Sequence, residues 1–217
     1  MAKNTVISMA VVRRLPKYHR YLFELLKNDV QRISSKEFSQ RIGFTASQIR
    51  QDLNCFGDFG QQGYGYNVKE LYDSISKIIG LDKTYNMVIV GAGNIGQAVA
   101  NYTKFEKMGF HLIGMFDKNP KLTGMKIRDI EIQDVEELGD FLKKNITDIG
   151  VICIPKSQAQ SVANVLSEGG VKGIWNFAPT DLVVPDNIMV ENVHLSDSLY
   201  TLSYMLNEKE LFNNIDE

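Results

Sequence analysis

Glycine residues at a fixed spacing give the clearest chemical signal in this chain. An apolar run, residues 87–90, is followed by Gly91-Ala92-Gly93-Asn94-Ile95-Gly96, and residues 97–100 then favour a helix. A strand, a G-x-G-x-x-G turn and a helix form the context in which this motif binds a dinucleotide. The first glycine permits the tight turn, the second lets the backbone approach a pyrophosphate, and the third lets the helix pack on its strand. The alternative is an ordinary glycine turn between a strand and a helix.

An acidic residue supports the dinucleotide interpretation. Residues 111–116 predict a second strand, and Asp117 closes it 21 positions after Gly96. An acid at this point binds the ribose hydroxyls of adenosine. Because its charge disfavours a 2′-phosphate, the predicted cofactor is NADH or NAD⁺. We expect further cofactor contacts beside this acid and at the ends of later strands, at Lys118, Ile154, Pro155, Asn176 and Phe177.

Basic and amide side chains near the N-terminus suggest a second kind of chemistry. Residues 34–37 and 45–48 both have the pattern of a capping box, and Gly43 between them suits the end of a helix. Two short helices at a tight turn predict a helix-turn-helix, about residues 17–56, whose second helix enters the major groove of DNA. Arginine pairs with guanine and glutamine with adenine, so the expected base-reading set is Ser47, Gln48, Arg50 and Gln51.

A glycine-rich stretch, residues 57–66, predicts the hairpin wing of a winged helix. Phosphate contacts are expected from Lys17, Ser35 and Lys36. The other DNA-binding candidates lie at the second helix and the wing: Thr45, Phe56, Gly57, Gly63, Tyr64 and Gly65. A small helical domain that serves only protein contact is the alternative.

Charge is distributed unevenly along the 217 residues. Residues 1–80 carry 12 basic against 7 acidic side chains, and residues 81–217 carry 12 against 19, which fits an N-terminal part that meets a polyanion. We expect no membrane span and a cytoplasmic protein. Cys55 and Cys153 are too far apart in sequence to suggest a disulfide framework, and no metal site is expected.

The C-terminal segment and the lack of a predicted catalytic acid bear on oligomeric state and function. Four leucines recur at helical spacing in the tail, which predicts a helix that packs on its own sheet or, as we favour, in a second subunit. A dehydrogenase needs a proton donor beside the nicotinamide and a substrate domain, and the sequence indicates neither. The interpretation is therefore a sensor of NADH rather than an enzyme. The alternatives are a small NAD(H)-dependent oxidoreductase with an N-terminal assembly domain and a CoA-binding regulatory protein, against which Asp117 argues.

Five ordered motifs together resemble the bacterial Rex repressors: residues 34–37, residues 49–53 with Phe56-Gly57, residues 63–66, residues 91–96 and residues 176–179. The resemblance implies a homodimeric redox-sensing repressor that binds palindromic double-stranded operator DNA and is released by NADH. It also implies that Arg20 and Tyr102 couple the nicotinamide pocket to the DNA-binding domain, and that Tyr102 contacts the cofactor. His194 or Asp197 is the expected polar partner of Tyr102.

The expected fold class is α/β in three parts. Residues 1–80 form a winged helix-turn-helix domain, residues 81–192 a Rossmann-type doubly wound parallel sheet that binds NAD(H), and residues 193–217 a C-terminal helix and tail for dimerisation. By the resemblance, this helix is exchanged between subunits.

Overall fold

A computed structural model describes residues 7–57, 59–61 and 64–213 of the chain. Contacts divide the chain into two compact units, one ending at Lys83 and the other beginning at Thr84. The division falls three residues after the boundary at residue 80 that the sequence predicts. The C-terminal helix is grouped with the second unit.

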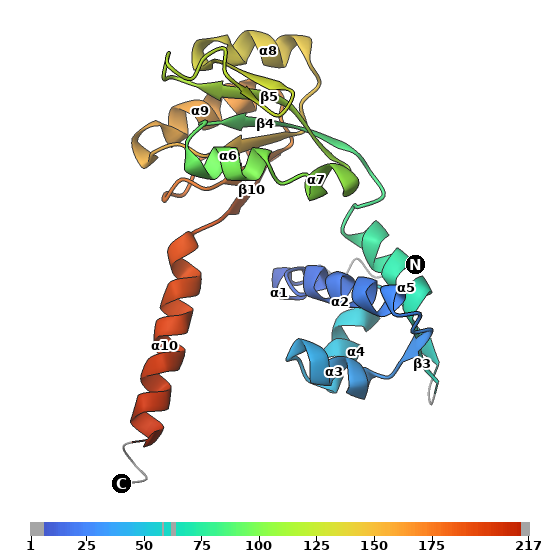
Figure 1. Ribbon diagram of the computed structural model, residues 1–217. Coiled ribbons are helices and arrows are strands. Elements are labelled where there is room, and N and C mark those ends of the chain that lie inside the picture. The colour runs from blue at the N-terminus through green and yellow to red at the C-terminus, as the bar shows by residue number, and fades with distance from the viewer. Residues whose placement is uncertain (1–6, 58, 62–63, 214–217) are drawn as a thin grey trace. The chain divides into compact units, whose positions relative to one another are not determined.

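The N-terminal unit combines helices with a small antiparallel sheet of strand order β1-β3-β2 (Figure 1). Strand β3 pairs with both neighbours, so the expected hairpin becomes part of a sheet that also includes β1 from before the helix-turn-helix. The elements are α1 Met9–Val12, α2 Leu15–Lys27, β1 Arg32–Ile33, α3 Ser35–Ile42, α4 Ala46–Asn54, β2 Gly60–Gln61, β3 Gly65–Asn67 and α5 Val68–Ile78.

Local sequence explains where the two short helices begin. Ser34 accepts a hydrogen bond from the backbone N–H of Glu37, and the Glu37 carboxylate accepts one from the Ser34 backbone, so the predicted capping box is confirmed. Thr45 caps α4 by accepting from the Gln48 N–H. The prediction of a second full capping box is wrong, because the Gln48 side chain donates instead to Asp52 at 3.1 Å.

A buried carboxylate joins α2 to α4. Asp52 is 1% exposed and accepts two hydrogen bonds from the Arg14 guanidinium, at 2.6 and 2.7 Å, and one from the Tyr18 hydroxyl at 2.6 Å. Burial raises the pKa of Asp52, but the hydrogen bonds from Arg14, Tyr18 and Gln48 outweigh it, so the pKa lies below its ordinary value of 3.8. The carboxylate therefore stays charged and fixes the position of α4 against α2.

The second unit is an α/β layer structure with a seven-stranded sheet of order β10-β9-β8-β4-β5-β7-β6, parallel except for the pair β6–β7 (Figure 1). Its strands are β4 Tyr85–Val90, β5 Phe110–Asp117, β6 Lys126–Ile127, β7 Ile130–Asp134, β8 Ile149–Ile152, β9 Gly173–Asn176 and β10 Met189–Asn192. Its helices are α6 Asn94–Ala100, α7 Lys104–Lys107, the 3₁₀ turn η1 Val135–Glu137, α8 Leu138–Lys144, α9 Lys156–Glu168 and α10 Leu195–Asn213.

Strand β4 carries the sheet's two cores on its alternate residues. Val88 and Val90 pack in the cluster with α8 and α9, whereas Met87 and Ile89 pack in the cluster that includes Ala100 of α6. Because β4 pairs with β5 on one side and β8 on the other, the chain reverses its direction of winding here. The carboxyl ends of strands at such a point are where ligands bind in open α/β sheets.

Some local expectations differ from the structure. Strands β6, β7 and β10, which lie at or near the two edges of the sheet, were not predicted from the sequence. Helix α9 begins at Lys156, with Pro155 in the cap position. Within the described ranges, no helix has the length and apolar character needed to cross a membrane.

Asp52→Ala is expected to lower the free energy of unfolding of the N-terminal unit by about 3 kcal/mol, because Arg14 and Tyr18 lose their buried partner. Urea denaturation followed by circular dichroism measures this. Asp73→Ala, which breaks an exposed pair with Lys69, is the control and should change stability by at most about 0.5 kcal/mol.

Acidification tests the same carboxylate. The pKa of Asp52 is depressed in the folded state, so its contribution is present above pH 3.8 and is lost as the pH falls through the folded-state value. Asp52→Asn should therefore lose less stability than the wild type as the pH falls from about 5 to about 2, the range in which carboxyl groups titrate. Equal acid sensitivity of the two proteins would contradict the role given to this group.

Candidate nucleotide cleft and nucleic-acid interface

The glycine turn between β4 and α6 has the geometry that its motif requires. Gly91 has a φ of +106°, and a side chain there would overlap the carbonyl oxygen of Cys153. A side chain at Gly96 would overlap the carbonyl oxygen of Gly91. At Gly93, in contrast, an added Cβ would have nothing within 4 Å. The first and third glycines therefore let backbones meet, and the second leaves its backbone open to a ligand.

Asp117 lies at the end of β5 and is tied to the glycine turn. Its Oδ2 accepts a hydrogen bond from the Ala92 N–H at 2.6 Å, and its Oδ1 accepts from the Asn119 N–H at 2.8 Å. The side chain is half-buried, and a carboxylate has further lone pairs beyond these two. The turn therefore orients an acid that can still accept hydrogen bonds from ribose hydroxyls.

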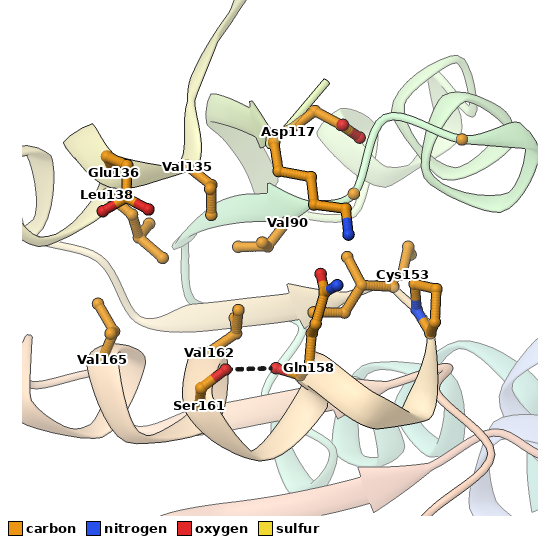
Figure 2. A pocket seen from close by; sticks show the side chains of 15 residues that line it. Val90, Asp117, Val135, Glu136, Leu138, Cys153, Gln158, Ser161, Val162 and Val165 are labelled. Carbon is orange, nitrogen blue, oxygen red and sulfur yellow. Dashed lines mark hydrogen bonds between the residues drawn. The ribbon is translucent and has the colours of Figure 1, made fainter. Parts of the chain in front are cut away.

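A cleft of about 530 Å³ opens beside this turn, between the ends of β4 and β5 and the helix α9 (Figure 2). Figure 2 shows Asp117 on one side of it and Gln158, Ser161 and Val162 of α9 on the other. The walls are largely apolar, and the lining comprises Val90, Gly91, Gly93, Asp117, Lys118, Val135, Glu136, Leu138, Cys153, Ile154, Pro155, Gln158, Ser161, Val162 and Val165. The structure thus brings together six of the predicted cofactor residues: Gly91, Gly93, Asp117, Lys118, Ile154 and Pro155.

The other predicted cofactor residues are not part of the cleft lining. Asn94 and Ile95 are exposed on the first turn of α6, and Ala92 and Gly96 are buried in the glycine turn. Tyr102 is 46% exposed and its ring packs against Phe105. Phe105 meets Trp175 edge-on, and Trp175 in turn contacts Phe177. This row of aromatic rings joins Tyr102 to Phe177 outside the cleft.

Asn176 is occupied by its own chain. The side chain is fully buried, and its amide nitrogen donates to the Thr180 carbonyl and to Asn192 Oδ1, both at 2.8 Å. Its Oδ1 accepts from the Ala178 N–H at 3.0 Å. Asn176 therefore shapes the loop after β9, and the structure does not present its side chain to a ligand.

Cys153 lines the cleft without being a reactive thiol. Burial raises the pKa of its thiol to about 12, so the nucleophilic thiolate is scarce at neutral pH. Cys153 instead packs against the hydrophobic cluster beside the end of β8.

The helix-turn-helix presents polar side chains from α4. Ser47, Arg50 and Gln51 are exposed, while Ile49 and Leu53 of the same helix are buried. Gly43, with a φ of +72°, ends α3 in the left-handed conformation that the sequence predicted. The predicted base-reading residues therefore share the outer side of α4, apart from Gln48, which is half-buried and bonded to Asp52.

The predicted phosphate contacts flank this helix. Arg50 Nη1 donates to the Ser35 hydroxyl at 3.0 Å, which brings α4 and the start of α3 together. Lys36 is exposed on α3, and the Lys17 ammonium lies 4.9 Å from the centre of the Phe44 ring. Thr45 is exposed at the start of α4, where its hydroxyl is the helix cap.

The remaining predicted DNA contacts lie in the hairpin and in the segment between α4 and the hairpin. Tyr64 is 69% exposed, and Gly65 has a φ of +69° at a point where a side chain would collide with the Ile33 carbonyl. Phe56 is half-buried against the core, Gly57 is exposed, and Gly63 lies outside the described residues. Arg32, which sequence analysis missed, donates to the Tyr64 carbonyl at 3.4 Å and adds a cation to this hairpin.

The predicted coupling residues are distributed over both units. Arg20 is exposed on α2, and Tyr102 follows α6. His194 is half-buried and Asp197 exposed at the start of α10, where the Asp197 N–H donates to the His194 carbonyl at 3.1 Å. In the part of the chain that is described, no three His, Cys, Asp or Glu side chains are grouped in a way that would hold a metal ion.

Family comparisons cover both units. A family described as a CoA binding domain matches residues 82–180, and one described as the N-terminus of a putative DNA-binding protein matches residues 6–54. CoA and NAD both contain adenosine diphosphate, so the first match fits the cleft without separating these two cofactors.

Full-length relatives decide the family. The redox-sensing transcriptional repressor Rex of Thermoanaerobacter sp. (strain X514) is 65% identical over 215 residues, 99% of this chain and 96% of that protein. The Rex protein of Clostridium botulinum (strain Alaska E43 / Type E3) is 68% identical over 209 residues, 96% of this chain and all of that protein. The chain belongs to the Rex family.

Solved structures agree with this assignment. The crystal structure of RSP, a Rex-family repressor, matches with a TM-score of 0.90 at 63% identity and covers 99% of this chain and 100% of its own. RSP in complex with β-NAD⁺ and operator DNA matches with a TM-score of 0.89 at 65% identity over 98% of both chains. The Rex resemblance and the α/β fold class are confirmed, and the chain is a redox-sensing transcriptional repressor rather than an oxidoreductase.

Two glycine substitutions should separate binding from stability. Gly93→Ala is expected to keep the melting temperature, because the added methyl meets open space, and to weaken NADH binding at least about tenfold, since that space is where a diphosphate approaches. Gly96→Ala is expected to lower stability by about 3 kcal/mol, because its methyl overlaps the Gly91 carbonyl. Calorimetric titration and thermal denaturation measure the two effects.

Gly139→Ala in α8 is the matched control, because its Cβ would make one ordinary contact with Val165. It should leave NADH affinity unchanged and raise stability slightly, by about 0.5 kcal/mol. Full NADH affinity in Gly93→Ala would show that the diphosphate does not pass over this turn.

Proposed function

We propose that this chain represses transcription as a homodimer that binds palindromic operator DNA through α4 and releases it when NADH occupies the cleft beside the glycine turn. The observation that carries the proposal is that one chain combines an exposed helix-turn-helix with a nucleotide cleft. RSP, its relative over nearly the whole length, has been crystallised with β-NADH and with β-NAD⁺ plus operator DNA. Operator DNA is in the bacterial cytoplasm, where we expect the protein to act.

DNA recognition is assigned to the outer side of α4. An arginine that reaches guanine and a glutamine that reaches adenine read base edges in the major groove, the roles proposed for Arg50 and Gln51, with Ser47 and Gln48 beside them. Contacts to the DNA phosphates fix the register of a protein on the duplex without reading its sequence. We assign these contacts to Lys17, Ser35, Lys36 and Thr45, together with Gly57, Tyr64 and Gly65 at the hairpin.

The cofactor is assigned to the cleft by its chemistry. Gly93 offers open backbone for the diphosphate, Asp117 accepts hydrogen bonds from the ribose, and the apolar walls suit adenine. NAD⁺ carries a positive charge on its nicotinamide that NADH lacks, and burying a charge among apolar groups is unfavourable. A closed apolar pocket around the nicotinamide would therefore favour the reduced form.

Release requires that NADH bind the released arrangement more tightly than the DNA-bound one. Moving a dimer from about 99% to about 1% competent needs roughly a 10⁴-fold difference, about 5.5 kcal/mol, summed over its sites. We assign the coupling to Arg20 and Tyr102, with His194 or Asp197 as the polar partner of the tyrosine.

Dimerisation is assigned to α10. Leu195, Leu199, Leu202 and Leu206 are 50–64% exposed and form one stripe along this helix. Burial of a leucine side chain contributes about 1.5–3 kcal/mol, so a free apolar stripe of this length is poorly suited to water. A second subunit that covers it would also give the two-fold symmetry that a palindromic operator needs.

Fluorescence anisotropy of a palindromic duplex, selected from random DNA, tests the function. We expect NADH to release the duplex at concentrations at which NAD⁺ leaves it bound. Arg50→Ala should weaken specific binding by about 1–3 kcal/mol while sparing NADH affinity, and Lys69→Ala on α5 is the control that should change neither. Insensitivity of the complex to NADH would refute the proposed function.

Sedimentation velocity tests the dimer. Leu199→Asp combined with Leu206→Asp is expected to give a monomer with much weaker operator binding, because two charges would enter the apolar stripe. Thr201→Asp, outside the leucine stripe of α10, is the charged control and should remain dimeric. A double variant that stays dimeric would move the interface away from this helix.

A further inference from the structure

The cleft beside the glycine turn is complete for one half of a dinucleotide. Its lining includes open backbone at Gly93 and the Asp117 carboxylate, with apolar walls that run on to η1 and α9. Tyr102, Asn176 and Phe177 are not part of this lining. We propose that adenosine 5′-diphosphate binds this cleft in place of NAD(H) and, when bound, leaves the repressor on its operator, an inference that rests on the proposed function.

The diphosphate end of the cleft is formed by backbone and one cation. Gly93 is exposed, and the space beside its Cα is empty to 4 Å. Lys118 lines the same cleft and is exposed, so its ammonium is available to a phosphate that lies along the turn. A nucleoside diphosphate and the diphosphate of a dinucleotide present similar oxygens to these groups.

The ribose and base have separate partners. Asp117 is held by the Ala92 and Asn119 N–H groups and keeps lone pairs for the ribose hydroxyls. Beyond it, the walls formed by Val90, Val135 and Val162 enclose an apolar slot next to α9 (Figure 2). A flat purine buries more surface in such a slot than a pyrimidine does, so we expect adenosine diphosphate to bind more tightly than uridine diphosphate.

Occupancy of this half of the site is not expected to release DNA. A ligand shifts a conformational equilibrium only by its differential affinity for the two arrangements. In the proposed function that difference comes from the nicotinamide ring, which adenosine diphosphate lacks. The nucleotide should therefore act as a competitive antagonist of NADH, so that the repressor would respond to NADH relative to the adenine nucleotide pool as well as to NAD⁺.

The experiment uses the full-length protein on its operator duplex. Calorimetric titration gives the affinity for adenosine diphosphate, and anisotropy then follows NADH titrations with and without it. At ten times its dissociation constant, adenosine diphosphate should raise the NADH concentration for half release about elevenfold, as competition at one site requires. Alone, it should leave the duplex bound. Uridine diphosphate at the same concentration should shift the midpoint less.

Variants locate the effect in the cleft. Gly93→Ala should weaken adenosine diphosphate and NADH together, whereas Gly139→Ala should weaken neither. If NADH releases the operator but adenosine diphosphate fails to bind, or releases the operator itself, the inference is overturned while the proposed function stands. If NADH fails to release the operator, the proposed function falls, and calorimetry still shows whether the cleft binds adenosine diphosphate.

Discussion

The second unit depends on a point where three backbones meet without side chains. Strand β4, helix α6 and the end of β8 converge at the glycine turn, where a Cβ at Gly96 would overlap the Gly91 carbonyl and one at Gly91 would overlap the Cys153 carbonyl. The same turn leaves open space beside Gly93 and donates the Ala92 N–H to Asp117. The same glycine turn therefore joins the packed backbones and forms one wall of the cleft, which fixes the position of the ligand site relative to the sheet.

The N-terminal unit depends on a different interaction. The Asp52 carboxylate binds Arg14 and Tyr18 of the preceding helical segments and also Gln48 of its own helix. A buried charge that is fully partnered permits few arrangements of α4. The orientation of the exposed residues beyond it, Arg50 among them, follows from this buried network. Gln48 belongs both to this network and to the predicted base-reading set, and its hydrogen bond to Asp52 limits the rotamers with which it can read a base.

Sequence alone predicted the features that depend on one residue type in one local geometry. The close backbone approaches at Gly91 and Gly96 and the Ser34 capping box are of this kind. The Asp52 network was missed because Arg14 lies 38 positions away in sequence and nothing local marks the pair. Strands β7 and β10 were missed because short segments near a sheet edge take their structure from their neighbours. Likewise, the position of Asn176 at a strand end was predictable, but the direction of its side chain was not.

The segment just before α10 is hydrogen-bonded to the nucleotide-binding sheet. Buried Asn176 donates to Asn192, the last residue of β10, and Asn192 donates to Asp181 at 3.2 Å. Helix α10 starts three residues later, at Leu195. A displacement at the end of β9 would therefore also shift the start of the proposed dimer helix. Coupling of this kind is reciprocal by thermodynamic linkage. If NADH lowers the affinity for the operator by a given factor, the operator lowers the affinity for NADH by the same factor. The repressor therefore binds NADH more weakly when it is on DNA than when it is free.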